Sequence, residues 1–190
     1  LGILFPDKGE VKVGDVAGTK KTLAMIRQRL GLVFQDSDDQ LFMTTLYDDV
    51  AFGPRNLNLS ESEVNSRVNE ALEMVGIPQL ANRAPFKLSG GEKRAAAIAS
   101  VLSMQPDVLI MDEPTSGLDP KSRRRLIHIL KGFSHTKIIT SHDLDMVMET
   151  CDRIIVIKDG EVAASGSQLE ILTNESLLND CGLEIPLALQ

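Results

Sequence analysis

Two adjacent carboxylates follow a continuous apolar run in the second half of the chain. The run covers residues 108–111, and Asp112 and Glu113 come directly after it. Ligands of open α/β sheets lie at the carboxyl ends of the strands, where adjacent side chains point in different directions. One carboxylate can therefore face a metal ion while the other faces a water molecule. The alternative is a strand followed by a plain polar turn that ends at Pro114.

The stretch LSGGEKR, residues 88–94, combines two features of an anion site. Ser89 and Glu92 have the S-x-x-E spacing of a capping box, which opens a helix. Gly90 and Gly91 leave the first amides of that helix bare, and such amides attract anions. Glycine costs helix stability, so two glycines in a first turn indicate a reason. We interpret that reason as anion binding; the alternative is a capped helix whose glycines allow close packing.

Three further polar features lie at strand ends or beside the carboxylates. The turn-rich loop PTSGLDP, residues 114–120, follows Glu113 directly. Gln35 ends an apolar run that begins at residue 30, and His142 ends another that begins at residue 137. A lone glutamine or histidine at such a place is more often structural than catalytic, so neither carries an assignment by itself.

The elements that must position these residues predict an α/β fold. Strands at 108–111 and 137–142 with a helix at 121–132 between them form a right-handed crossover in a parallel sheet. Capping boxes at Ser60 and Ser89 predict two further helices. Short extended segments are predicted at 10–16 and 30–35. A hairpin at 154–164 turns at Asp159-Gly160, and a single amphipathic helix at 168–178 follows it.

The composition of the chain limits the classes of molecule that it could bind. The chain has 190 residues, a net charge of −7, 4% aromatic residues and no Trp. Nucleic-acid surfaces need clustered Lys and Arg or stacking aromatics, so nucleic acid is set aside as a partner. The densest basic cluster, residues 121–125, is interpreted as a solvated helix face. Two distant cysteines predict no metal pattern, and no apolar run approaches the ~20 residues that span a bilayer.

The order of these pieces resembles the ATP-binding cassette, the ATPase subunit of ABC transporters. Gln35, LSGGE, a strand ending in Asp-Glu, SGLD and a strand ending in His142 follow one another within residues 10–167. The stretch VFQDSDDQLFMTTLYDDVAFGPRNLNLS, residues 33–60, is similar to the energy-coupling-factor type, which includes the cobalt and nickel importers. The resemblance implies a P-loop NTPase-like, mostly parallel sheet with flanking helices and an α-helical insertion.

The resemblance also implies residue roles. Asp112 and Gln35 would hold Mg²⁺, and Glu113 would act as general base on the attacking water. His142 would contact the γ-phosphate, and Gln35 would also act in catalysis and sense the membrane partner. The residues expected to contact ATP or the dimer interface are Ser89, Gly90, Gly91, Glu92, Ser116, Gly117, Leu118 and Asp119.

The implied function is ATP hydrolysis that powers an importer of metal ions or vitamins. The partners would be a second ATPase subunit, identical or not, and a transmembrane coupling subunit at the cytoplasmic face of the membrane. The α/β core would comprise 1–35 and 105–190, and a helical subdomain, 36–104, would face the membrane partner. A non-catalytic cassette that lends LSGGE and SGLD to a partner's ATP site is the alternative. An ABC-type ATPase of DNA repair or translation fits less well, since such proteins usually carry coiled-coil insertions or tandem cassettes.

One part of the family pattern is missing: the chain contains no G-x-x-x-x-G-K-[ST] sequence. The stretch VGDVAGTK, residues 13–20, has the wrong spacing and predicts a turn between short strands. We expect the phosphate loop upstream, because losing its central strand would exceed the ~5–15 kcal/mol of net stability a domain has. The opening LGILFPDKGEV would then be the end of the phosphate-loop helix and the turn after it; a true truncation is the alternative.

Overall fold

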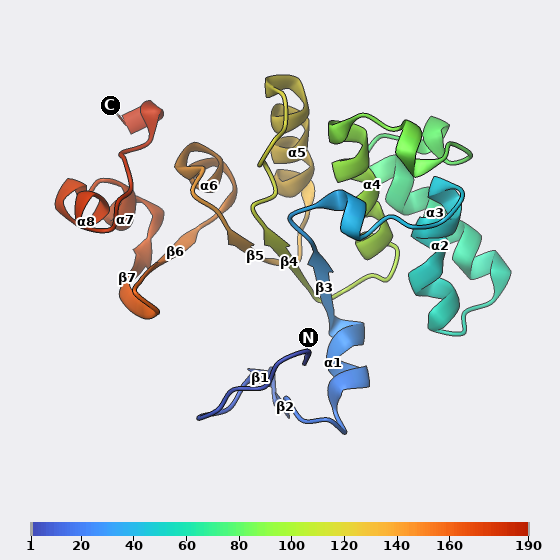
Figure 1. Ribbon diagram of the computed structural model, residues 1–190, viewed down its shortest axis with the longest axis horizontal. Coiled ribbons are helices and arrows are strands. Elements are labelled where there is room, and N and C mark those ends of the chain that lie inside the picture. The colour runs from blue at the N-terminus through green and yellow to red at the C-terminus, as the bar shows by residue number, and fades with distance from the viewer. Residues whose placement is uncertain (1, 190) are drawn as a thin grey trace. The chain divides into compact units, whose positions relative to one another are not determined.

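The computed structural model describes residues 2–189, which fall into two compact units (Figure 1). Within the described residues, unit 1 comprises 2–112 and 135–138, and unit 2 comprises 113–134 and 139–189. Each unit is described by itself below.

Unit 1 begins with a small hairpin and continues into a mixed α/β arrangement. Its elements are β1 (Lys12–Val13), β2 (Val16–Ala17), α1 (Leu23–Arg29), β3 (Leu30–Val33), η1 (Ser37–Asp39), α2 (Leu46–Asn56), α3 (Glu61–Met74), η2 (Pro78–Leu80), η3 (Pro85–Lys87), α4 (Gly90–Leu102) and β4 (Val108–Asp112). β1 and β2 pair antiparallel, and Gly14 between them has a φ of +57°. The predicted turn between short strands is therefore confirmed.

A parallel pair of strands lies at the centre of unit 1. β3 pairs with β4 in parallel, with Leu30 opposite Val108, and the three-stranded sheet has the order β3-β4-β5. β5 (Thr136–Thr140) starts in unit 1 and ends in unit 2. A Cβ added to Gly31 would lie 2.2 Å from Cγ1 of Val101, so β3 packs closely against α4. The parallel sheet with helices confirms the predicted fold class.

Three helices, α2, α3 and α4, pack together in unit 1 (Figure 1). Thr45, Ser60 and Ser89 each cap one of them by accepting a hydrogen bond from a backbone amide of the first turn. The predicted capping boxes at Ser60 and Ser89 are both formed. The helices bury one apolar core, made by Leu46, Val50, Val64, Val68, Leu72 and Ile98.

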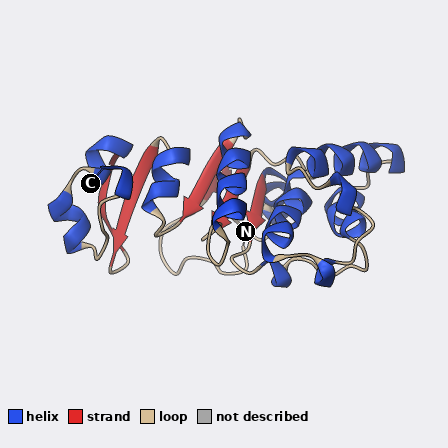
Figure 2. Ribbon diagram, turned by 90° about the horizontal axis from the view of Figure 1, so that it is seen from above, coloured by secondary structure: helices blue, strands red, loops and turns tan. Residues whose placement is uncertain are grey.

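Unit 2 consists of helices and an antiparallel hairpin. Its elements are α5 (Pro120–Gly132), α6 (Leu144–Thr150), β6 (Arg153–Lys158), β7 (Glu161–Ser167), α7 (Gln168–Leu172), α8 (Glu175–Asp180) and η4 (Leu187–Leu189). Figure 2 shows β6 and β7 as neighbouring strands. Asp159 and Gly160 have φ of 51° and 81°, as a tight hairpin turn requires, which confirms the predicted turn.

The prediction of a single helix over residues 168–178 is wrong. α7 ends at Leu172 and α8 begins at Glu175. The side chain of Asn174 accepts a hydrogen bond of 3.1 Å from the amide of Leu177 and so caps a new helix. Short polar side chains compete with the helix for backbone partners, which explains the break.

A helix that crosses a membrane must be both long and apolar. Among residues 2–189, no helix combines the necessary length with the necessary apolar character.

Candidate functional site

Glu113 lies in unit 2 in an unusual backbone conformation. Its φ is +42°, in the left-handed region that non-glycine residues rarely adopt. Its amide donates to the carbonyl of Thr140 at 2.9 Å, and its own carbonyl accepts from the amide of Ser116 at 3.1 Å. Such a residue costs of the order of 1–3 kcal/mol and persists where its surroundings fix it. The backbone thus fixes the position of the Cα atom from which this side chain extends.

Three donor groups orient the carboxylate of Glu113. Oε1 lies 2.9 Å from Nδ1 of His142 and accepts from the backbone amide of His142 at 3.0 Å. Oε2 accepts from the hydroxyl of Ser141 at 3.2 Å. The side chain of Glu113 is 21% exposed and that of His142 is 77% exposed. The predicted catalytic pair therefore comes together, with the carboxylate fixed and the imidazole open to solvent.

The hydrogen bond and charge of Glu113 raise the pKa of His142 above its ordinary range. A protonated imidazole beside a carboxylate is a donor suited to anionic oxygens. The carboxylate is a proton acceptor for a water molecule within hydrogen-bond reach. The pair can therefore combine a base with a cationic donor.

A second network holds the turn that carries His142. Asp143 accepts two hydrogen bonds from Arg123, at 2.7 and 2.8 Å, and one from the hydroxyl of Thr115 at 3.0 Å. Asp143 also caps α6 through the amide of Met146. Hydrogen bonding to Arg123 holds the pKa of Asp143 below its ordinary value. The network ties the loop after Glu113 and the first turn of α5 to the turn after β5.

This network was not predicted from the sequence. The basic cluster at 121–125 was expected to be a solvated helix face, and that expectation is wrong for Arg123, which is 27% exposed and bound to Asp143. Arg124 is 64% exposed and pairs with Glu149 at 2.7 Å. The available signal was the placement of Asp143 directly after the candidate His142.

The SGLD segment forms the lead-in to α5. Asp119 is the N-cap of α5; it accepts from the hydroxyl of Ser122 and from the amides of Ser122 and Lys121, and these bonds lower its pKa. Gly117 has a φ of +70°, and Ser116 is exposed. An open cleft of about 980 Å³ within unit 2 is lined by residues of this loop together with the Arg123 network, including Ser116, Gly117, Arg123, His142 and Asp143.

The LSGGE segment forms the N-terminus of α4 in unit 1. Oε2 of Glu92 accepts from the amide of Ser89 at 2.8 Å, which completes the capping box. A Cβ built on Gly90 meets no heavy atom within 4 Å, and Gly90 is exposed. Close packing among the described residues therefore does not explain Gly90. Because the carboxylate of Glu92 is bound to the backbone amide of Ser89, the first turn presents mainly amides to an incoming anion.

Asp112 and Gln35 end up at the same edge of the sheet in unit 1. Val33 of β3 is opposite Met111 of β4, and the two polar residues follow these positions. Both are exposed. Nucleotide-bound Mg²⁺ needs only one or two protein ligands beside water and phosphate oxygens. A carboxylate and an amide oxygen fit that requirement.

The sequence was compared with known families and proteins. The profile of the family described as ABC transporter matches residues 1–116. A provisionally named ABC transporter ATP-binding protein of Geobacter sulfurreducens is 57% identical over 189 residues, 100% of this chain and 76% of that protein. The energy-coupling factor transporter ATP-binding protein EcfA of Methanothermobacter thermautotrophicus is 46% identical, over 97% of this chain and 61% of that protein.

Solved structures give the same answer. The structure of cbiO1 from Clostridium perfringens, part of the ABC transporter complex cbiONQ, has a TM-score of 0.83 and 38% identity, over 94% of this chain and 74% of that one. A dimeric ATP-binding cassette in a post-hydrolysis state, bound to ADP and Pi, has a TM-score of 0.76 and 28% identity, over 87% of this chain and 76% of that one. With a family match over residues 1–116 and relatives of 46% identity or more along nearly all its length, the chain belongs to the ATP-binding proteins of ABC transporters.

Proposed function

We propose that the protein hydrolyses ATP to power an energy-coupling-factor-type importer of metal ions or vitamins. The observation that carries the hydrolysis proposal is the carboxylate of Glu113, oriented by His142 and Ser141. The relatives named for energy-coupling factor and for cbiONQ support the importer type. Because this chain contains no G-x-x-x-x-G-K-[ST] sequence, hydrolysis is proposed for a protein in which a phosphate loop precedes it.

The residues divide the work as follows. Bound Mg²⁺-ATP would supply the transferable phosphoryl group and the positive charge at its oxygens. Glu113 accepts a proton from the attacking water, and its three donors hold it in place. His142 offers a cationic donor to the terminal phosphate. Asp112 and Gln35 are the proposed Mg²⁺ ligands, and Gln35 also helps to place the water.

A second ATPase subunit completes the proposed site. The N-terminus of α4, with exposed Ser89 and Gly90 and half-buried Gly91, would contact the terminal phosphate of ATP held by that subunit. Ser116 and Asp119 would lie at the interface. The dimeric ATP-binding cassette with ADP and Pi supports this arrangement. The two subunits are either identical or two different ATPases.

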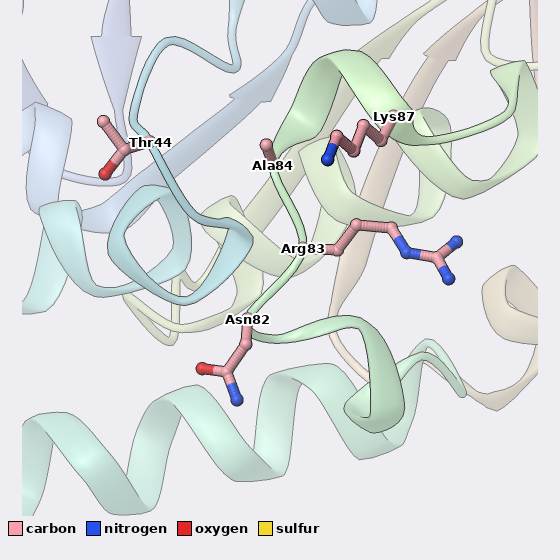
Figure 3. A pocket seen from close by; sticks show the side chains of 5 residues that line it. All are labelled: Thr44, Asn82, Arg83, Ala84 and Lys87. Atoms are coloured by element: carbon pink, nitrogen blue, oxygen red, sulfur yellow. The ribbon is translucent and has the colours of Figure 1, made fainter.

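We place the transmembrane partner on unit 1. An open pocket of about 600 Å³ is lined by Thr44 on one side and by Asn82, Arg83, Ala84 and Lys87 on the other (Figure 3). The two sides are joined where the amides of Leu46 and Tyr47, at the start of α2, donate to the carbonyls of Arg83 and Ala81. These bonds satisfy helix amides that otherwise lack partners, and they fix the start of α2 against the segment that carries Arg83.

Exposed aromatic side chains lie in the same two segments. Phe42 is 63% exposed and Phe86 is 79% exposed. The segment that carries Phe42 is fixed by Asp49, whose Oδ1 accepts from the amides of Phe42 and Met43. An open pocket whose lining segments also carry exposed aromatic side chains suits a helix-in-groove contact. Docking there would hold the protein at the cytoplasmic face of the membrane.

The test is phosphate release from Mg²⁺-ATP by the full-length protein, alone and with its transmembrane subunit. Release that the transmembrane subunit stimulates would support the proposal, and no release in either case would overturn it. ATP-dependent pairing with an intact ATPase, without hydrolysis at this chain's own site, would instead favour the non-catalytic cassette.

A further inference from the structure

The loop that carries Gln35 is held by a buried arginine of α4. Nη1 of Arg94 donates to the carbonyl of Phe34 at 2.7 Å, and Nη2 donates to the carbonyl of Gln35. Both contacts lie inside unit 1. The guanidinium fork therefore binds the backbone of two consecutive residues and leaves the exposed Gln35 side chain free to point elsewhere.

The environment of Arg94 is unusual for a structural surface arginine. The residue is only 5% exposed, and its Nε is buried without a hydrogen-bond partner among the described residues. Burial lowers the pKa of Arg94, and the charge of Asp36 opposes that effect. Burying a guanidinium against neutral carbonyls is costly. A long apolar side chain could fill the space without that cost, so the fork must contribute more than packing.

Two more residues of the loop, Asp38 and Gln40, join it to the same helix. Nζ of Lys93 lies 2.5 Å from Oδ1 of Asp38. Gln40 donates to the carbonyl of Ala97 at 2.7 Å and to the hydroxyl of Ser100 at 2.9 Å, and accepts from the amide of Phe34 at 3.1 Å. The loop is thus attached to α4 at both of its ends, and Arg94 provides the attachment nearest Gln35.

The helix that holds this loop also begins with the LSGGE turn. Arg94 follows Ser89 by five positions, little more than one helical turn beyond the capping box. We propose that Arg94 is a positioning residue that fixes Gln35 relative to the N-terminus of α4, so that the two phosphate-directed parts of unit 1 move as one body. This inference rests on the proposed function, in which Gln35 and Ser89–Gly91 serve two ATP sites.

Arginine is suited to this role and lysine is not. The planar fork reaches two carbonyls at once, whereas an ammonium is a single point charge. Arg94→Lys therefore keeps the charge and loses the geometry, and Arg94→Gln loses both. Lys93→Gln is the matched control, because it removes only a contact to the exposed side chain of Asp38.

The first measurement is hydrogen exchange of the full-length protein, which needs no ATPase activity. Arg94→Gln should speed exchange of the amides of residues 34–41 about tenfold and leave α3 unchanged. Lys93→Gln should change the same amides less than twofold. Unchanged exchange at 34–41 in Arg94→Gln would overturn the clamp. If that variant fails to fold, Arg94→Lys is measured instead, with the same two outcomes.

The second measurement is a double-mutant cycle on ATP hydrolysis. Arg94→Gln should lower kcat about tenfold with little change in KM, because a small misplacement of a positioned group is costly. In the Gln35→Ala background the same substitution should change kcat less than about twofold, since the group it positions is gone. Equal losses in both backgrounds would show a general structural effect and overturn the proposal. A wild-type protein without activity would count against the proposed function alone, because the exchange measurement still decides the clamp.

Discussion

Nδ1 of His142 lies 2.9 Å from Oε1 of Glu113, and the backbone amide of His142 donates to the same oxygen. One residue thus binds the candidate base twice, once through its backbone and once through its ring. The imidazole and the carboxylate therefore hold each other in place.

The pKa of His142 should exceed its ordinary value of about 6.5, because the bond and charge of Glu113 favour the imidazolium. The interaction stabilises the fold fully below about pH 6.5 and is lost as pH rises through the higher folded pKa. An NMR titration of the histidine ring checks this. Glu113→Gln should return the His142 pKa towards its ordinary value, and an unchanged titration in that variant would contradict the pairing.

Glu113→Gln should lower phosphate release by about 10²- to 10⁴-fold, because the amide cannot accept the proton of the attacking water. ATP affinity should persist, since Glu113 is not proposed to hold the nucleotide. Steady-state hydrolysis and equilibrium ATP binding measure the two effects. Glu161→Gln, at an exposed site in β7, is the control and should keep full activity. Full activity in Glu113→Gln would remove this residue as the base.

Gly90→Ala should separate stability from function. The added Cβ meets no described atom within 4 Å, and alanine favours helix by up to about 1 kcal/mol, so thermal stability should stay or rise. ATP-dependent dimerisation and hydrolysis should fall, because the methyl group crowds the anion-facing turn. Calorimetry and light scattering measure these quantities.

Gly31→Ala is the matched comparison for Gly90. Its Cβ would lie 2.2 Å from Val101, so stability should drop by about 1–3 kcal/mol through overpacking. An active, ATP-dimerising Gly90→Ala protein would argue that this turn does not approach the nucleotide.

Asp143→Asn should destabilise unit 2 by about 1–3 kcal/mol at neutral pH, because it weakens two charge-assisted bonds from Arg123. The pKa of Asp143 is lowered, so this stabilisation is present above its unfolded pKa of about 3.9 and is lost as pH falls through the folded value. Urea unfolding at pH 7 and at acid pH measures the difference.

The pair of Arg124 with Glu149 provides the control for that prediction. Glu149→Gln should cost less than Asp143→Asn, because Arg124 is 64% exposed whereas Arg123 is 27% exposed. If the loss in Asp143→Asn were as large at acid pH as at pH 7, the ion pair would not be its source.

Local signals in the sequence predicted much of the fold. The capping boxes at Ser60 and Ser89, the Asp159-Gly160 turn and the apolar runs each depend on neighbours a few residues away. The prediction of one continuous helix failed at Asn174, because this residue caps a new helix although the helical pattern continues through it. The subdomain boundary at residues 36–104 stays a prediction.

The sequence predicted the candidate catalytic residues but not the residues that hold them in place. Glu113 and His142 were predicted because each follows an apolar run and because the order of the motifs resembles the ATP-binding cassette. Arg94 and the bond between Arg123 and Asp143 were not found, because their partners lie 59 and 20 positions away and become neighbours only in the folded chain. The sequence around a basic residue on a helix does not indicate whether its side chain is buried or solvated.

The left-handed backbone of Glu113 has a consequence for how this protein would evolve in the laboratory. At a φ of +42° glycine is the least strained residue, so in a library screened only for heat resistance relief of backbone strain competes with loss of the carboxylate's hydrogen bonds. A library screened for nucleotide turnover should keep the acid. The residue recovered at this one codon would therefore report which pressure a selection had applied.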